Sequence, residues 1–284
     1  MMQTDVRDNL VARDHAALVA ACDPGVSLCT VVGVEGSFSR AIGAQLAILP
    51  DGNVIGDLAD GCLENQLVSD IANADAPFVR RYGRGSSVID FQLPCGGGVD
   101  ILLDPSPDRI AICRTVDSLE KRQPARLRLP ENDFLCERAY NPALRIRVFG
   151  EGPEVRMLFA LAQAAGVETE IVAKNDLTLR SPSGLREADA FTAVLLLFHD
   201  HEWEAALLEE ALKSPTFFIG AQGGENARMA RSVALMERGV PEEQIARIVS
   251  PVGLIANCKR ADTLALSAIA QIVERYERAY GTAG

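Results

Sequence analysis

The chain has 284 residues, of which 48% are hydrophobic and 24% are charged, and its formal net charge is -11. This length exceeds what one compact core usually holds, so we expect two domains. The negative charge argues against a nucleic-acid or membrane-surface partner, because both need a dense patch of Lys and Arg. No segment has the length and apolar character of a membrane span or a signal peptide. We therefore expect a cytoplasmic protein.

The seven cysteines are scattered along the chain and form no Cys-x-x-Cys pair. Such spacing fits neither a disulfide framework nor a zinc ribbon. Free cysteine behaves as a small hydrophobe, so most of these thiols are expected to be buried and structural. The cysteines expected to be buried are Cys22, Cys29, Cys113 and Cys136. Cys62 and Cys95 differ because each lies in a glycine-rich turn.

The first part of the chain, residues 1–130, is expected to form an α+β domain. Its strands come in runs, with helices between them, and this order is typical of that class. Asp51-Gly52 predicts a tight hairpin turn. The elements predicted from periodicity and breakers are helices over 6–21, 61–74 and 107–119, and strands over 27–34, 44–49, 54–55, 78–82, 88–93, 99–103 and 125–129.

The second part, residues 143–284, changes to strands that alternate with helices. Strands that are apolar on both faces predict a parallel sheet covered on two sides, so the class is α/β with a Rossmann-like, doubly wound second domain. Residues 131–142 are polar and irregular, and we expect them to be a linker. The predicted elements are strands over 144–149, 170–173, 193–198 and 216–219, and helices over 153–165, 202–212, 227–238 and 261–280.

Gly150 and Gly152 follow a predicted strand and precede a helix, which is the context of a dinucleotide-binding fingerprint. In that motif the phosphates lie at the positive end of the helix. Three features oppose it here. Val155 replaces the usual small residue, Glu151 brings negative charge toward the phosphates, and Ala173 stands where an acid would bind the ribose. An open crevice is therefore favoured over tight NAD(P) binding.

His199 and Asp200 follow the strand over 193–198, at the edge where open α/β sheets place their ligands. The alternative is that Asp200 caps the next helix and that His199 and His201 are surface imidazoles.

The segment 34–44 carries two glycines, small hydroxyl residues and one arginine between two strands. Gly36, Ser37 and Arg40 suit a cradle for an anion, and a plain polar loop is the alternative. Cys62 follows Gly61 at the start of a predicted helix, where the helix end favours the thiolate. A thiolate is a soft ligand that suits a heavy transition metal.

The second thiol in a glycine-rich turn is Cys95, which precedes Gly96 and Gly97. These glycines leave its sulfur little side-chain shielding. Two thiols in such turns of one domain strengthen the interpretation that both have a function.

Taken together and in this order, the segments resemble the XdhC/CoxI family of accessory proteins for xanthine dehydrogenase and carbon monoxide dehydrogenase. Many short matches in a fixed order are more specific than any single glycine motif. The matching residues are Val34-Glu35-Gly36-Ser37 with Arg40 and Gly43-Ala44, Asp51-Gly52, Gly61-Cys62-Leu63-Glu64, Cys95-Gly96-Gly97, Asp104-Pro105, Gly150, Gly152, His199-Asp200, Ser214-Pro215, Ile219-Gly220-Ala221, Gly239-Val240-Pro241 and Pro251-Val252-Gly253-Leu254.

The resemblance implies that the chain binds molybdenum cofactor (molybdopterin), assists its sulfuration with a cysteine desulfurase, and delivers it to a xanthine-dehydrogenase-like apoenzyme. It makes Cys62 and Cys95 the candidate molybdenum or sulfur contacts. The other candidate cofactor-binding residues are Gly36, Ser37, Arg40, Gly61, Glu64, Gly96, Gly97, Gly150, Gly152, His199, Asp200 and Gly220. No catalytic residue is assigned, because the expected role is that of a maturation chaperone. A homodimer is the expected assembly.

Particular residues also suggest two alternative functions. Gly150 and Gly152 alone suggest an NAD(P)-dependent oxidoreductase. Glu225-Asn226-Ala227-Arg228 stands where relatives carry a basic Arg-Arg-Thr-His run, and the Glu225-Asn226 substitution suggests a regulator that no longer binds cofactor.

Overall fold

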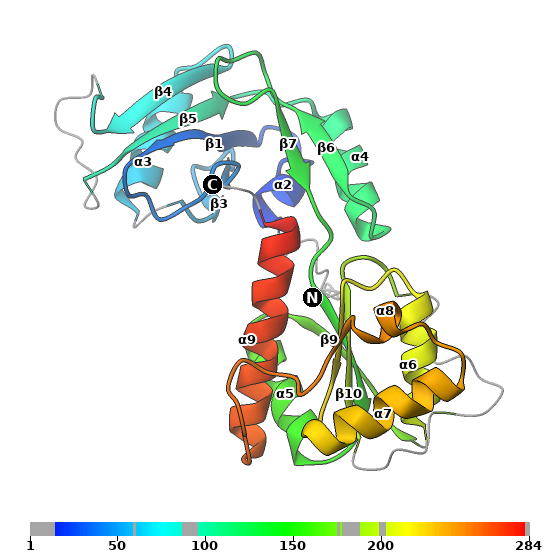
Figure 1. Cartoon of the computed structure of the whole chain (residues 1–284). Helices are drawn as coiled ribbons and strands as arrows, with labels where there is room; N and C mark the ends of the chain where they lie inside the picture. The colour runs from blue at the N-terminus through cyan, green and yellow to red at the C-terminus, as the bar shows by residue number, and fades with distance from the viewer. Residues whose placement is uncertain are drawn as a thin grey trace, which may run out of the picture. The chain divides into compact units, whose positions relative to one another are not determined.

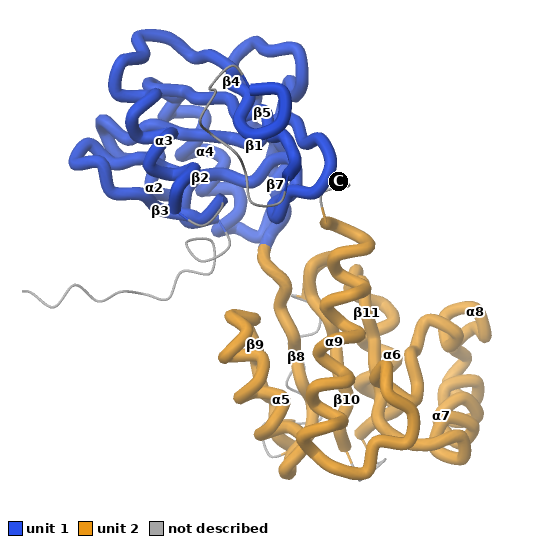
Figure 2. The backbone as a smooth tube through the Cα atoms, turned by 90° about the vertical axis from the view of Figure 1, so that its left-hand side faces the viewer, with its two compact units in different colours: residues 1–142, 282–284 blue, residues 143–281 orange. Residues whose placement is uncertain are grey.

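A computed structural model describes residues 15–58, 61–86, 96–174, 177, 188–198 and 203–281. The chain divides into two compact units, residues 1–142 with 282–284 and residues 143–281 (Figure 2). Each unit has hydrophobic clusters of its own. Across the described residues, every helix is too short or too polar to cross a membrane.

The first unit is built on a five-stranded sheet with the order β3-β2-β1-β5-β4 (Figure 1). Every neighbouring pair is antiparallel. The sheet is buried on both faces: α3 packs on one, and α2 and α4 pack on the other. The elements are α2 (Ala16–Ala20), β1 (Ser27–Glu35), β2 (Gln45–Ile48), β3 (Val54–Gly56), α3 (Cys62–Ile71), β4 (Phe78–Gly83), β5 (Gly98–Asp104), α4 (Arg109–Glu120), β6 (Ala125–Arg128) and β7 (Glu137–Tyr140).

The predicted hairpin turn between β2 and β3 is confirmed. The backbone N–H of Asn53 donates to Asp51 Oδ1 at 2.9 Å, and the N–H of Leu49 donates to the Asn53 carbonyl at 2.8 Å. Gly52 has a φ of 85°, a conformation that glycine adopts without a steric penalty. The turn therefore forms from local chemistry alone.

The prediction that residues 131–142 are irregular is wrong in part. Residues Glu137–Tyr140 form β7, which pairs antiparallel with β6. The Tyr140 side chain joins the core under the sheet, and the Arg138 guanidinium lies 4.1 Å from the centre of its ring. Four residues with only one large apolar side chain give too weak an alternation to be recognised as a strand. The predicted strand at 88–93 and the first nine residues of the predicted helix at 6–21 lie outside the described residues.

The second unit contains a five-stranded parallel sheet with the order β12-β11-β10-β8-β9. Numbered from the first strand of this unit, the order is the 2-1-3-4-5 arrangement of one class of doubly wound folds. The predicted Rossmann-like α/β fold is confirmed. The elements are β8 (Arg145–Gly150), α5 (Pro153–Ala164), β9 (Glu168–Val172), β10 (Thr192–Leu197), α6 (Glu204–Lys213), β11 (Phe218–Ala221), α7 (Glu225–Glu237), α8 (Glu242–Ile245), β12 (Ile248–Val249) and α9 (Ala261–Tyr280).

Helices cover both faces of this sheet. α5 and α9 lie side by side on one face, and α6 and α7 cover the other (Figure 1). Open sheets of this class bind ligands outside the carboxyl ends of their strands, at the point where the strand order reverses. Here that point lies between β8 and β10. α8 and β12 were not predicted, because each is too short to show a period.

Candidate functional site

Two of the glycine-rich segments meet at one end of the first sheet. The pairing of β1 with β5 places Glu35 opposite Gly98. A Cβ atom on Gly97 would lie 2.9 Å from the carbonyl oxygen of Glu35 and would overlap that of Ser37. A Cβ on Gly36, which has a φ of 74°, would lie 3.7 Å from the Cα of Gly97. The loop after β1 and the turn before β5 are therefore in backbone contact, which requires glycine at 97.

The same loop also contacts the segment that leads into α3. Arg40 donates from Nη2 to Asp57 Oδ2 at 2.5 Å and from Nε to the Asp57 carbonyl at 3.1 Å. The half-buried Phe38 packs on the cluster that contains Leu58 and Leu63. All three N-terminal segments recognised in the sequence therefore converge within one unit. Arg40, predicted as part of an anion cradle, already has a carboxylate partner here.

The start of α3 presents a thiol on a tightly held turn. Gly61 is the N-cap, with a φ of 93°, and a Cβ there would meet nothing within 4 Å. Cys62, the first helical residue, is exposed. Glu64 is only 7% exposed, and its carboxylate accepts the N–H of Gly61 at 2.8 Å and that of Leu58 at 3.1 Å. Glu64 therefore acts on the turn that carries Cys62 and positions it.

The second candidate thiol, Cys95, lies outside the described residues. Gly96, which follows it, has a φ of 68°, and a Cβ there would also meet nothing within 4 Å. Gly61 and Gly96, which neighbour the two candidate thiols in the sequence, therefore each have open space where a side chain would stand. No group of three or more metal-ligating side chains occurs in the part of the chain that the structure describes.

Three other cysteines of the first unit are less exposed than Cys62. Cys29 is buried within β1, and burial strongly raises the pKa of its thiol. Burial and a hydrogen bond with Cys113 raise the pKa of Cys22 to about 12. Both Cys22 and Cys113 are only half-buried. The expectation that Cys136 is buried is wrong, because Cys136 lies where β6 and β7 are joined and is exposed.

In the second unit, Gly150 and Gly152 lie at the point where the strand order reverses. A Cβ on Gly150 would lie 2.5 Å from the carbonyl oxygen of Leu197 in β10, so this glycine lets the two strands approach. Gly152 is the N-cap of α5, with a φ of 109°. The Glu151 carboxylate accepts the N–H of Lys174 at 2.9 Å, just beyond β9. A carboxylate therefore stands at this end of the sheet, where a dinucleotide would place its phosphates.

Three other candidates of the second unit have different positions. His199 and Asp200 lie outside the described residues. Gly220 is inside β11, where a Cβ would lie 2.9 Å from the side chains of Leu195 and Val252. Its position is therefore in the packed core of the unit.

A buried ion pair near the carboxyl ends of the strands was not recognised in the sequence. Arg231 in α7 is 5% exposed, and its Nη2 lies 2.6 Å from Glu204 Oε1 in α6. It also donates to Ser250 Oγ at 2.6 Å and to the Gln222 carbonyl at 2.8 Å. The guanidinium thus joins α6 and α7 to the segments that follow β11 and β12. In the sequence, the only sign of this ion pair is a charged residue on the apolar face of a predicted helix.

Both units of the chain match models of known protein families. A family model described as the XdhC Rossmann domain matches residues 146–272, and one described as the XdhC and CoxI family matches residues 23–83. The chain is 30% identical over 267 residues to the molybdenum cofactor insertion chaperone PaoD of Escherichia coli (strain K12). That match covers 87% of this chain and 82% of PaoD.

Two further similarities are weaker. The Escherichia coli protein YqeB is 24% identical over 262 residues, which is 90% of this chain and 44% of YqeB. A crystal structure from Bacillus halodurans, described as a xanthine dehydrogenase, superposes with a TM-score of 0.71 at 21% identity and shares the fold. The superposition covers 95% of this chain and 97% of that one. From the identity to PaoD and the two family models, the chain belongs to the XdhC and CoxI family.

Proposed function

We propose that this protein binds molybdenum cofactor and delivers it to a molybdenum-containing apoenzyme. The relative PaoD is described as a molybdenum cofactor insertion chaperone. The observation that carries the proposal is the convergence of the loop after β1, the turn before β5 and the start of α3, where Cys62 is exposed. This arrangement holds a thiol at a site bordered by glycine backbone.

Each part of this arrangement has a distinct role in the proposal. The sulfur of Cys62 is the ligand offered to molybdenum, because thiolate is a soft donor. Cys95, from the neighbouring turn, is the second candidate contact. Gly36, Gly61 and Gly96 are exposed and leave backbone accessible where the cofactor would approach. Glu64 keeps Cys62 in place through two backbone N–H groups.

We further propose the finer points of this role. The target is a xanthine-dehydrogenase-like enzyme, a cysteine desulfurase supplies sulfur to the bound cofactor, and the exchange takes place in the cytoplasm. The chain would act as a homodimer and as a chaperone that catalyses no reaction of its own. The residues 143–284 would form a separate Rossmann-like domain after a linker over 131–142 that includes β7.

The test measures molybdenum in protein purified from a host supplied with molybdate. The parent should retain the cofactor, and Cys62→Ser should lose most of it while keeping the parent's melting temperature. Cys136→Ser is the matched control, because Cys136 is also exposed but lies in the β6–β7 hairpin. A second assay adds the loaded protein to a xanthine-dehydrogenase-like apoenzyme and follows the gain in activity. A parent that retains no molybdenum and activates no apoenzyme would contradict the proposal.

A further inference from the structure

Two thiols of the first unit meet on the side of the sheet that α2 and α4 cover. Cys22 lies in the turn after α2, where it packs on the core cluster of that side, and Cys113 lies within α4. Each is half-buried, and a hydrogen bond joins the two side chains. The proposed function uses neither thiol.

The contact follows from the face of α4 that meets the turn. Residues four apart lie on one face of a helix, so Arg109, Cys113 and Asp117 form a row on α4. Arg109 donates from Nε to the Asp23 carbonyl at 3.1 Å, which holds the start of this row against the turn. Burial raises the pKa of the Cys22 thiol, and the negative charges of Asp23 and Asp117 add to the rise. Cys22 therefore lies beside the row, where Cys113 stands.

The turn that carries Cys22 is held by its own backbone. The N–H of Cys22 donates to the Val19 carbonyl at 3.1 Å, and the N–H of Asp23 donates to the Ala20 carbonyl at 3.0 Å. Because its pKa is raised, the Cys22 thiol keeps its proton near neutral pH, so the resting form of the pair is two thiols. Half-burial still leaves both sulfurs within reach of a small reagent.

We propose that Cys22 and Cys113 form a reversible disulfide when the protein meets a peroxide. Hydrogen peroxide takes two electrons from the pair: both S–H bonds and the O–O bond break, one S–S bond forms, and two molecules of water leave. Dithiothreitol reverses the step by thiol–disulfide exchange and becomes a cyclic disulfide itself. In a reducing compartment the pair stays as thiols, so the disulfide marks oxidising conditions. This inference does not depend on the proposed function.

The disulfide would close a loop that contains the whole five-stranded sheet. All of β1, β2, β3, β4 and β5 lie between positions 22 and 113 of the chain. A cross-link over a long loop stabilises a protein mainly by restricting the unfolded chain. The oxidised protein should therefore melt several degrees above the reduced protein.

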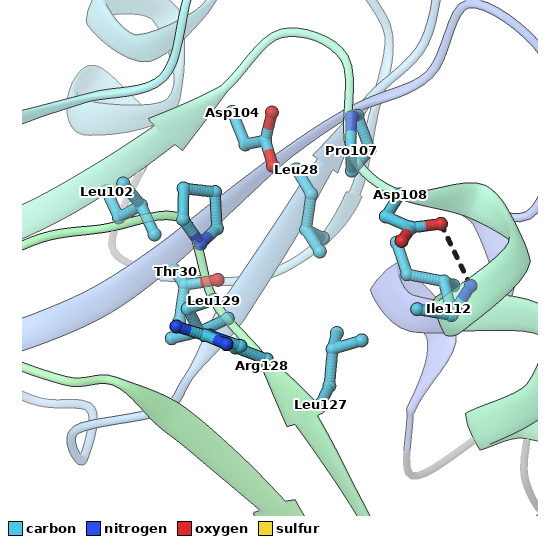
Figure 3. Close-up of a pocket in the computed structure, with 12 residues that line it drawn as sticks. Leu28, Thr30, Leu102, Asp104, Pro107, Asp108, Ile112, Leu127, Arg128 and Leu129 are labelled. Atoms are coloured by element: carbon cyan, nitrogen blue, oxygen red, sulfur yellow. Dashed lines mark hydrogen bonds between the residues drawn. The ribbon is translucent and has the colours of Figure 1, made fainter.

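The disulfide would also fix one wall of a pocket of about 290 Å³ (Figure 3). Asp108 and Ile112 line the pocket from α4, and Ile112 directly precedes Cys113. Leu28 and Asp104 line it from the sheet, and Asp104 is only 7% exposed. Backbone amides of α4 should therefore exchange with deuterated water more slowly in the oxidised protein.

The experiment maps the disulfide in the full-length protein. Reduced protein is treated with hydrogen peroxide, the remaining thiols are alkylated with iodoacetamide, and the chain is digested without reduction. Cleavage before Asp23 separates Cys22 from Cys29. The peptide that ends at Cys22 should be linked to the peptide that contains Cys113, and dithiothreitol should release both.

Three variants show whether this pair causes the rise in melting temperature. Cys22→Ser and Cys113→Ser should each lose the rise and leave the other thiol open to alkylation. Cys136→Ser is the matched control, because Cys136 lies in the β6–β7 hairpin, and it should keep the whole rise.

Alkylation of both Cys22 and Cys113 after peroxide treatment would overturn the inference, as would a linkage of either to a different cysteine. A rise in melting temperature that persists in Cys113→Ser would do the same. The peptide map of the parent decides the question even if a variant fails to fold. None of these measurements involves molybdenum, so the result is separate from that of the cofactor test.

Discussion

The carbonyl oxygen of Ser37 stands where Gly97 would carry a side chain, because a Cβ added to Gly97 would overlap that oxygen. Gly97→Ala should therefore destabilise the protein by about 1–3 kcal/mol, the usual cost of inserting a methyl group into packed structure. The loop after β1 would have to shift, and molybdenum retention should fall with it. The measurement is denaturant unfolding together with metal content.

Gly239→Ala, in the second unit and outside the proposed site, is the control for this change. Gly239 has a φ of 80° but open space around it, so alanine there should cost only about 1–2 kcal/mol of backbone strain and leave the loop after β1 in place. If Gly97→Ala retains molybdenum as well as Gly239→Ala does, the backbone contact has no part in cofactor binding.

Glu64 should matter for stability and for the order of the turn before α3. Glu64→Ala leaves the N–H groups of Leu58 and Gly61 without their acceptor, which should cost about 1–3 kcal/mol. Glu64→Gln keeps an acceptor and should cost less. Thermal melting gives the ranking, and alkylation of Cys62 by iodoacetamide reports whether the turn has loosened. Equal stability of all three proteins would show that the two hydrogen bonds contribute nothing.

Asp104 should reduce stability at neutral pH. Burial raises the pKa of its carboxyl, so between the unfolded and folded pKa values the folded protein binds more protons than the unfolded one. Stability from this group is then fully present below the unfolded pKa and is lost as pH rises through the folded pKa. Asp104→Asn should be more stable than the parent at pH 7, by less than about 1 kcal/mol because water reaches the pocket.

The gain should disappear below about pH 4, where the parent's carboxyl is neutral in both states. Urea unfolding at several pH values measures it. A parent that is more stable than Asp104→Asn at pH 7 would reverse the sign and contradict the assignment of burial as the dominant cause.

The Arg231–Glu204 pair should behave as a unit. Arg231→Met leaves the Glu204 carboxylate buried without its guanidinium, and the expected loss is about 3–5 kcal/mol. The double variant with Glu204→Leu removes both charges and should recover much of that loss. Urea unfolding of the two variants tests the coupling. Losses that simply add would show that the two side chains do not depend on each other.

NADH should bind the second unit only weakly, with a dissociation constant above about 1 μM. β9 ends at Val172, with Ala173 next, so the ribose lacks its usual carboxylate, and the loss of such an acceptor costs about 1–3 kcal/mol. Glu151 adds a negative charge beside the phosphates. Calorimetry gives the constant, and sub-micromolar binding with hydride transfer would favour the oxidoreductase alternative.

The parts of the fold that follow from local chemistry were predictable. Asp51 and Gly52 are sufficient to predict the β2–β3 turn. The continuous apolar run of β10 in the second unit likewise predicts that this strand is buried. β7 and β12 were missed because their pairing partners, and not their own residues, define them as strands. Segments of four and two residues are too short to show a period in the sequence.

The same distinction applies to the candidate site. Gly36, Cys62 and Gly97 could be recognised as motifs, but the approach of Gly36 to Gly97 depends on the β1–β5 register. The pocket at Asp104 was not predicted, because Leu28, Leu102 and Leu127 come together only in the folded unit. The single trace in the sequence is an aspartate and two prolines directly after an apolar strand.

The β1–β5 pairing also bears on how the protein is made. Ser27 Oγ donates to the Pro105 carbonyl across 78 residues, so the two central strands of the first sheet close a very long loop. Contacts between such distant segments form slowly. During synthesis, β1 cannot pair with β5 until β5 has left the ribosome. During that interval its apolar residues are exposed. Folding of this protein during synthesis should therefore require general molecular chaperones. A fragment truncated before Asp104 should aggregate.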